Sequence, residues 1–147
     1  MLAAALTRLE DDVTVVDTAP VLLTEPVGPS LRRYANSAAV IETKLDPPQL
    51  LGLVKRIERE FGRRQSGRRW TARVLDIDIV LWSRGSYAAP RLVVPHPLFR
   101  VRDFVLAPAA VIAAGWGDPV TGLTVRQLHA RLTRPSAVRR APAWSGP

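Results

Sequence analysis

The sequence of 147 residues contains no cysteine, which excludes disulfide bonds, thiolate nucleophiles and thiolate zinc sites. It also lacks an uninterrupted apolar run of about 18 residues, the length that a membrane-spanning helix requires, and its amino terminus lacks the pattern of a secretory signal. We therefore expect a cytoplasmic protein without a membrane span. Any metal would be bound by oxygen atoms or by the two histidines, and oxygen ligands favour magnesium or manganese.

The charge of the chain is strongly positive, with a formal value of +8 and an isoelectric point near 11.3. Such a charge favours phosphate-bearing partners, nucleic acids among them. Arginine far outnumbers lysine, however, and abundant arginine, alanine and proline can also reflect the coding bias of a GC-rich genome. The clustering is more informative, because five arginines lie between Arg63 and Arg73. Together they predict a pocket for a polyphosphate rather than a stripe along the surface.

The clearest element is a helix that starts at Asp46-Pro47-Pro48-Gln49. Asp46 is placed to cap it, proline suits the first helical position, and Gln49 can close a capping box. Apolar residues then recur at helical spacing, and Gly62 predicts the end of the helix. The apolar stripe consists of Leu50, Leu53, Val54, Ile57 and Phe61.

The remaining segments predict an α+β domain over residues 1–134, with helices packed on an antiparallel sheet. The small, basic and proline-rich segment 135–147, which includes Trp144, predicts a disordered tail. The other expected elements are a helix at 2–9, strands at 13–23, 34–43 and 73–81, a polar turn at 83–90, a strand at 92–94, a turn around His96, a helix capped by Asp103 that runs to about residue 113, and a helix from about 125 to 132 capped by Thr124.

Two carboxylates, Asp76 and Asp78, alternate with large apolar residues in the segment 73–81. Side chains two positions apart in a strand share a face, so both acids would project from one side while the apolar residues face a core. The pair could share one or two divalent cations, or could merely be solvated on an edge strand. The arginines upstream and His96 downstream favour a site that handles phosphate.

Other candidate residues leave structural alternatives open. His96, between two prolines, could donate to a phosphate or occupy an inert turn, whereas His129 predicts a surface or packing role. Trp70 could anchor a hinge or belong to a loop that closes over a ligand. Glu58 could serve the site or simply pair with Arg56 or Arg63. Arg64 and Arg68 are typical of a solvated basic loop.

The ordered motifs of the chain resemble those of 6-hydroxymethyl-7,8-dihydropterin pyrophosphokinase. The resemblance covers nearly everything from Leu2 to Leu132. It rests on Thr24-Glu25-Pro26-Val27-Gly28, Tyr34-Ala35-Asn36, Glu58, Gly62-Arg63, Arg69-Trp70, Arg73-x-x-Asp76-x-Asp78, Pro95-His96-Pro97 and Arg102-x-Phe104.

The resemblance implies a ferredoxin-like α+β fold and an enzyme of folate synthesis. This enzyme would be an ATP-dependent diphosphotransferase that converts ATP and the hydroxymethyl dihydropterin into AMP and the pterin methyl diphosphate. It would use two Mg²⁺ ions, act as a monomer and require neither nucleic acid nor a membrane.

The resemblance also implies a role for each matched residue. Asp76 and Asp78 would bridge the two Mg²⁺ ions. The groups on the ATP side would be Arg63, Arg73, Arg102, Trp70, His96 and Glu58, with Arg63 and Arg73 acting in catalysis. The groups on the pterin side would be Tyr34 and Phe104, which sandwich the ring, Asn36, which reads its hydrogen-bonding edge, and Thr24, Pro26 and Val27.

The family begins with a strand and a Gly-Ser-Asn-Leu-Gly loop, whereas this chain opens inside the helix that follows them. We therefore expect the sheet to lack its N-terminal strand, either because the start codon is placed too far downstream or because the protein is truncated. Two alternatives to the active enzyme remain. One is an inactive relative that retains ligand binding, and the other is a basic module that binds nucleic acid.

Overall fold

The computed structural model describes residues 1–24, 34–64 and 75–134, with the side chain of Arg64 left out. The expected tail at 135–147, with Trp144, lies outside these residues. The helices of the described residues are α1 (Leu2–Leu9), α2 (Pro47–Arg64), α3 (Asp103–Ile112), α4 (Val125–Thr133) and the short 3-10 helix η1 (Phe99–Val101). The strands are β1 (Thr14–Thr18), β2 (Leu22–Thr24), β3 (Tyr34–Asn36), β4 (Ala39–Glu42), β5 (Tyr87–Ala89) and β6 (Leu92–Val94).

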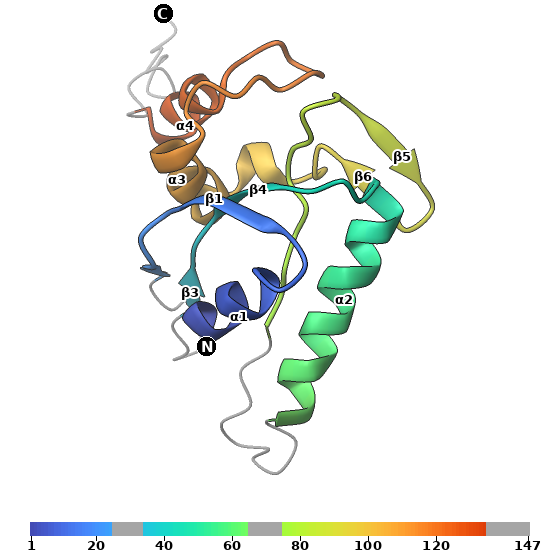
Figure 1. Ribbon diagram of the computed structural model, residues 1–147. Helices are drawn as coiled ribbons and strands as arrows, with labels where there is room; N and C mark the ends of the chain where they lie inside the picture. Colours follow the sequence, from blue (N-terminus) through green and yellow to red (C-terminus); the bar gives the residue numbers. More distant parts are fainter. Residues whose placement is uncertain (25–33, 65–74, 135–147) are drawn as a thin grey trace, which may run out of the picture.

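These strands form three antiparallel pairs, β1 with β4, β2 with β3, and β5 with β6. Figure 1 shows β1 and β4 running between α1 on one side and α3 with α4 on the other. The α+β class expected from the sequence is confirmed, whereas a single ferredoxin-like sheet stays a prediction.

The two long strands expected at 13–23 and 34–43 pair with each other, but each is divided into two. Pro20 follows β1 and has no N–H group, so it cannot continue a ladder of hydrogen bonds. At the same place the Ser37 hydroxyl donates to the carbonyl oxygen of Ala19 at 2.8 Å. At the break between the strands, the Ala19 carbonyl oxygen thus accepts a hydrogen bond from a side chain.

The strand expected at 73–81 is wrong for its described part, because residues 75–81 belong to no strand pair of the described residues. The segment lies between α2 and the β1–β4 pair (Figure 1), and Leu75 packs with residues of both α2 and α1. The alternating pattern specifies an extended segment with two faces, but a strand also needs a neighbouring backbone at hydrogen-bonding distance.

The sequence predicted a capping box at the start of α2 and Thr124 as the cap of α4, and the structure has a capping box at both helices. At the start of α2, the Gln49 N–H donates to Asp46 Oδ1 at 2.9 Å and the Asp46 N–H donates to Gln49 Oε1 at 3.0 Å, as expected. At α4 the Thr124 hydroxyl oxygen and Gln127 make the same reciprocal pair. The predicted end of α2 at Gly62 is wrong, since the helix continues to Arg64.

Two other boundaries also differ from the expectation. Asp103 is the first residue of α3 rather than its cap, and the cap position belongs to Arg102, whose side chain makes no capping bond. The segment expected as a polar turn at 83–90 contains β5, because the backbone of Tyr87–Ala89 pairs with that of Leu92–Val94.

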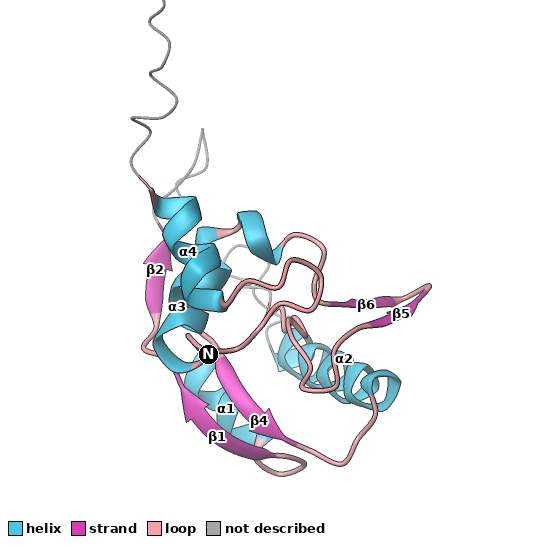
Figure 2. Ribbon diagram, turned by 90° about the horizontal axis from the view of Figure 1, so that it is seen from above, coloured by secondary structure: helices cyan, strands magenta, loops and turns pink. Residues whose placement is uncertain are grey.

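The apolar residues gather in two clusters. The first core cluster joins α1, α2 and the segment after residue 74, and it consists of Ala5, Leu9, Val13, Leu53, Ile57, Phe61 and Leu75. The second core cluster joins η1, α3 and α4, and it consists of Phe99, Leu106, Val125 and Leu128. Figure 2 shows α3 and α4 packed beside each other and apart from α2. None of the helices in the described ranges has the length and apolar composition of a membrane-spanning segment.

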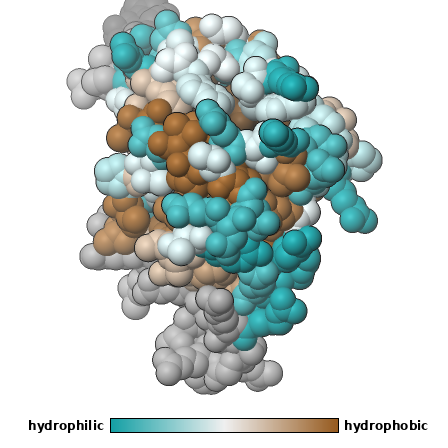
Figure 3. Space-filling view, viewed as in Figure 1, coloured by the Kyte–Doolittle hydropathy of each residue, from teal (hydrophilic) through white to brown (hydrophobic). Residues whose placement is uncertain are grey.

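The surface seen in Figure 3 is uneven in polarity. Apolar side chains gather across its middle, over β1 and β4, and hydrophilic side chains follow the outer side of α2. The side of α2 opposite its apolar stripe is therefore solvated, as its helical periodicity requires.

Candidate active site

Asp76 and Asp78 lie on the extended segment 75–81, and both are exposed. Leu75 is buried in the first core cluster and Ile77 packs against it. The alternation expected from the sequence is thus seen over residues 75–78 without a sheet, because Leu75 and Ile77 face the core and leave the two acids at the surface. It does not continue to Leu81, since the adjacent residues Val80 and Leu81 both pack against the second core cluster.

Glu58 on α2 is hydrogen-bonded to the backbone of this segment. Its Oε2 atom accepts the backbone N–H of Ile77 at 2.7 Å, and its Oε1 atom lies 3.0 Å from the Lys55 ammonium. The sequence suggested Arg56 or Arg63 as the partner of Glu58, whereas the structure pairs Glu58 with Lys55. Ile77 stands between the two aspartates, so Glu58 contributes to where both carboxylates lie.

His96 follows β6, directly after the cis peptide bond between Val94 and Pro95. Its Nδ1 atom accepts the N–H of Leu98 at 3.1 Å, which in the neutral ring leaves the proton on Nε2. The Nε2 atom lies 4.0 Å from Asp78 Oδ2, and the His96 backbone N–H donates to the Val80 carbonyl at 3.0 Å. The structure therefore brings the acid segment and the histidine turn together, as the sequence suggested.

Arg102 and Phe104 lie at the start of α3. The Arg102 guanidinium carbon is 5.6 Å from the centre of the Phe104 ring, and the Phe104 side chain is 41% exposed. This geometry is that of a cation–π contact. It leaves the aromatic ring accessible to a planar ligand.

Tyr34 and Asn36 lie on β3, two positions apart, and α3 contacts both β2 and β3. The Asn36 side-chain amide donates to Thr24 Oγ1 on β2 at 2.5 Å. The Tyr34 ring is 59% exposed. Three of the residues expected on the pterin side therefore share one hairpin beside α3.

Several expected site residues cannot be placed. Pro26, Val27, Trp70 and Arg73 lie outside the described residues, as do Arg68 and Arg69. Arg63 lies in the last turn of α2 and is exposed.

Asp76 and Asp78 form a small donor set for a metal. In the described part of the chain, no group of three or more histidine, aspartate or glutamate side chains could hold an ion. Two exposed carboxylates nonetheless fit Mg²⁺, which retains several waters and takes one or two carboxylates together with substrate phosphates. The chemistry of these residues thus suits magnesium that arrives with a nucleotide.

The sequence reasoning missed an ion pair behind the histidine turn, between Arg100 in η1 and Asp118 in the loop before α4. Arg100 Nε and a terminal guanidinium nitrogen donate to the two carboxylate oxygens at 2.6 and 2.8 Å. This guanidinium holds the pKa of Asp118 well below its usual range, against the opposing effect of burial. The segment Asp118-Pro119-x-Thr121-Gly122 has the composition of a turn, which could have predicted the loop but not the burial of its carboxylate.

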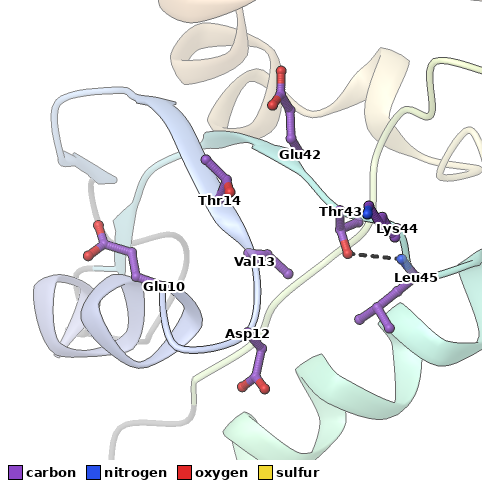
Figure 4. A pocket seen from close by; sticks show the side chains of 8 residues that line it. All are labelled: Glu10, Asp12, Val13, Thr14, Glu42, Thr43, Lys44 and Leu45. Atoms are coloured by element: carbon purple, nitrogen blue, oxygen red, sulfur yellow. Dashed lines mark hydrogen bonds between the residues drawn. The ribbon is translucent and has the colours of Figure 1, made fainter.

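An open hollow of about 590 Å³ lies elsewhere, between the α1–β1 turn and the β4–α2 connection. Figure 4 shows that its acidic side chains, Glu10, Asp12 and Glu42, point away from one another. The Thr43 hydroxyl oxygen in its wall accepts the Leu45 N–H at 3.1 Å. No expected site residue lines this hollow, so it is separate from the candidate active site.

The sequence of residues 1–114 matches the family model described as 7,8-dihydro-6-hydroxymethylpterin-pyrophosphokinase (HPPK). Among curated relatives, a 2-amino-4-hydroxy-6-hydroxymethyldihydropteridine pyrophosphokinase of Synechocystis is 39% identical over 101 residues, which cover 69% of this chain and 51% of the relative. The protein of the same name from Bacillus subtilis is 40% identical over 111 residues, 75% of this chain and 66% of the relative. A folate synthesis bifunctional protein of Arabidopsis thaliana is 41% identical over 86 residues, 58% of this chain and 18% of the relative. The chain thus spans about half to two thirds of the length of the first two relatives.

Proposed function

Because the chain belongs to the 7,8-dihydro-6-hydroxymethylpterin-pyrophosphokinase family, we propose that it transfers pyrophosphate from ATP to 6-hydroxymethyl-7,8-dihydropterin in folate biosynthesis. The products would be AMP and the pterin methyl diphosphate. One observation carries the proposal. The segment with Asp76 and Asp78 lies beside the turn with His96, with Asp78 Oδ2 and His96 Nε2 4.0 Å apart, and both lie within the residues that match the family model.

In this reaction the hydroxyl oxygen of the pterin attacks the β-phosphorus of ATP. The bond from that phosphorus to the oxygen bridging the α-phosphate breaks, AMP leaves with the electron pair, and the hydroxyl loses its proton. Asp76 and Asp78 would hold two Mg²⁺ ions, which supply charge neutralisation on the triphosphate and a lowered pKa of the hydroxyl. No described residue is assigned as the general base.

The groups around the aspartates would bind the triphosphate. His96 would donate its Nε2 proton to a phosphate oxygen, since its Nδ1 atom is engaged by the Leu98 N–H. Arg102, together with Arg63 and Arg73, would neutralise charge that spreads over the phosphoryl oxygens in the transition state. Trp70 would belong to the loop that closes over ATP, and Glu58 would hold the two-acid segment in place.

The hairpin of β2 and β3 and the start of α3 would bind the pterin. The exposed rings of Tyr34 and Phe104 would stack on the two faces of the pterin. The hydrogen bond from the Asn36 amide to Thr24 would orient the Asn36 carbonyl oxygen toward N–H donors of the pterin edge. Pro26 and Val27 would complete this side of the pocket.

The proposal extends to the setting of the reaction. The β1–β4 and β2–β3 pairs would belong to one ferredoxin-like sheet, and the enzyme would act as a monomer in the cytoplasm without nucleic acid.

Formation of AMP from ATP, the hydroxymethyl dihydropterin and Mg²⁺ tests the proposal directly, with Asp76→Ala and Asp78→Ala as controls. We expect turnover by the wild-type chain and none above background by either variant. No turnover at any protein concentration, with ATP and pterin still bound, would instead support an inactive relative. Salt-dependent binding of DNA or RNA without pterin binding would contradict both and favour a nucleic-acid module, which the charge of +8 allows.

A further inference from the structure

The loop between α3 and α4 contains Asp118, the one charged or polar residue in the buried set of the described chain, with 1% of its surface exposed. It lies beyond residue 114, where the match to the family model ends. Burying a carboxylate is costly unless it is paired and fully hydrogen-bonded, so its surroundings show what it serves.

The Asp118 carboxylate is satisfied on every side. Besides the two bonds from Arg100, it accepts the Val120 N–H at 3.0 Å and the Thr121 hydroxyl at 2.7 Å. The backbone closes the same loop, because the Asp118 N–H donates to Leu123 and its carbonyl oxygen accepts from Gly122, both at 2.8 Å. Gly122 adopts a φ of +75°, which favours glycine. The loop's own hydrogen bonds therefore fix the orientation of the carboxylate toward Arg100.

Arg100 lies within the short segment from His96 to Arg102, next to its middle residue, Phe99. Backbone hydrogen bonds run along this segment, from the Phe99 N–H to the His96 carbonyl at 3.2 Å and from the Arg102 N–H to the Phe99 carbonyl at 3.4 Å. The Phe99 ring is buried in the second core cluster, and the Arg100 guanidinium carbon lies 4.7 Å from its centre. The segment between the two proposed phosphate ligands is thus anchored at its centre by a ring and an ion pair.

We propose that Asp118 is a positioning residue for the reaction: by clamping Arg100, it sets the separation and orientation of His96 and Arg102 toward the triphosphate. This inference rests on the proposed function. It also separates two neighbouring arginines by role. The Arg100 guanidinium forms an ion pair with the fully buried side chain of Asp118, whereas the Arg102 guanidinium lies over the Phe104 ring at the proposed site. Arg100 is therefore a structural partner and Arg102 a ligand.

The test compares Asp118→Asn with Leu9→Ala, a variant in the first core cluster that also destabilises the fold but lies on α1. All proteins are measured at a temperature where unfolding curves show them to be folded. For Asp118→Asn we expect the dissociation constant of a non-hydrolysable ATP analogue with Mg²⁺ to rise about tenfold, as expected when a charge-assisted contact is weakened. The dissociation constant of the pterin measured without nucleotide should stay within about twofold of the wild-type value.

The rate should respond as well. Misplacement of a reacting group by about 1 Å can lower a rate by up to ~100-fold, so kcat/KM for ATP should fall by more for Asp118→Asn than for Leu9→Ala. Arg100→Gln should reproduce the effect of Asp118→Asn, and the double variant should be no worse than either single one, because the two side chains act as a unit.

A readout without ligand separates this inference from the proposed function. In the free protein, Asp118→Asn should shift the amide NMR signals of His96 and Arg102 as well as those of its own loop. Shifts confined to residues 115–124, or nucleotide binding equal to that of Leu9→Ala, would overturn the positioning role. If the wild-type chain forms no AMP, the proposed function fails, and the NMR comparison alone decides whether Asp118 positions the segment.

Discussion

The two segments that carry the proposed phosphate-side residues are held in different ways. The segment 75–81 joins no strand of the described chain. It is fixed by the burial of Leu75, by the bond from the Ile77 N–H to Glu58 and by the bond from the His96 N–H to the Val80 carbonyl. The segment from His96 to Arg102 contains a helical turn, a buried ring and the ion pair to Asp118. In both, a carboxylate from another element contacts the segment: Glu58 accepts a backbone N–H, whereas Asp118 accepts from the Arg100 side chain.

The difference between the two carboxylates lies in their exposure. The Glu58 side chain is 14% exposed and its cationic partner, Lys55, is 55% exposed. The Asp118 side chain is fully buried, and two nitrogens of the Arg100 guanidinium donate hydrogen bonds to it. Surface pairs contribute little, whereas removal of one partner from a buried pair leaves an uncompensated charge. We therefore expect loss of Glu58 to affect mainly activity, and loss of Asp118 to affect stability as well.

The largest effect should come from the exposed acids of the first segment. Asp78→Ala removes a proposed magnesium ligand, and metal stabilisation of several kcal/mol corresponds to a rate loss of about 10³-fold or more. The free energy of unfolding should change little, because the side chain is 47% exposed. Initial rates of AMP formation and urea unfolding measure the two effects, and a variant with near wild-type rate would contradict the metal-binding role.

The next largest effect concerns the stability of the second segment. Asp118→Asn leaves Arg100, whose side chain is 23% exposed, without its counter-charge, and we expect the free energy of unfolding to fall by about 1.5–3 kcal/mol. Urea unfolding monitored by circular dichroism provides the measurement. Thr121→Val, which removes only one neutral donor to the carboxylate, should cost about 1 kcal/mol and serves as the control. A loss for Asp118→Asn no larger than that of the control would show that the pair is dispensable.

The pH dependence of stability follows from the same carboxylate. The pKa of Asp118 in the folded protein is lowered by the hydrogen bonds from Arg100. Its contribution is therefore fully present above the unfolded pKa of about 3.9, and it is lost as the pH falls toward the folded pKa. The difference in unfolding free energy between the wild type and Asp118→Asn should stay constant from neutral pH to about pH 5 and shrink below pH 4. A difference that already shrinks between pH 7 and 5 would point to another titrating group.

Glu58→Ala should weaken the first segment without removing a ligand. Residues that orient metal ligands typically change activity by about 10- to 100-fold, and we expect a loss of AMP formation in that range. Lys55→Ala is the matched control, because it removes the ion pair and leaves the bond from Ile77 to Glu58 in place. Equal losses in the two variants would assign the effect to the ion pair instead.

The smallest effect is expected at the surface contact between α3 and α4. His129 Nε2 lies 3.2 Å from Asp103 Oδ1, and the Asp103 side chain is 65% exposed. Exposed pairs contribute at most about 1 kcal/mol, so His129→Gln should change the free energy of unfolding by no more than that and leave the rate of AMP formation within about twofold. A larger loss of activity would show that α4 contributes to the site through this contact as well as through the preceding loop.

Patterns within short stretches predicted their local structure well. The capping box at Asp46 and the cap residue Thr124 predicted both helix starts, since cap and helix are neighbours in the chain. The stop at Gly62 and the cap at Asp103 were wrong, because packing can extend a helix past a glycine and because a first-turn acid resembles a cap in sequence.

The structure shows where some of the expected site residues lie, and their roles stay predictions. The structure brings Asp78 near His96 and places Asn36 against Thr24, as an arrangement in one site requires. Trp70, Arg73, Pro26 and Val27 lie outside the described residues.

The sequence by itself determined the two faces of the Asp76–Asp78 segment, the starts of α2 and α4 and the family of the chain, because each depends on residues close in sequence or on their order. Only the tertiary structure decided that this segment lies beside α2 without a strand partner among the described residues, and that Asp118 is buried against Arg100. The physical reason is the same in both cases. Burial and hydrogen-bond partners arise between residues far apart in the chain, and a local pattern does not encode them.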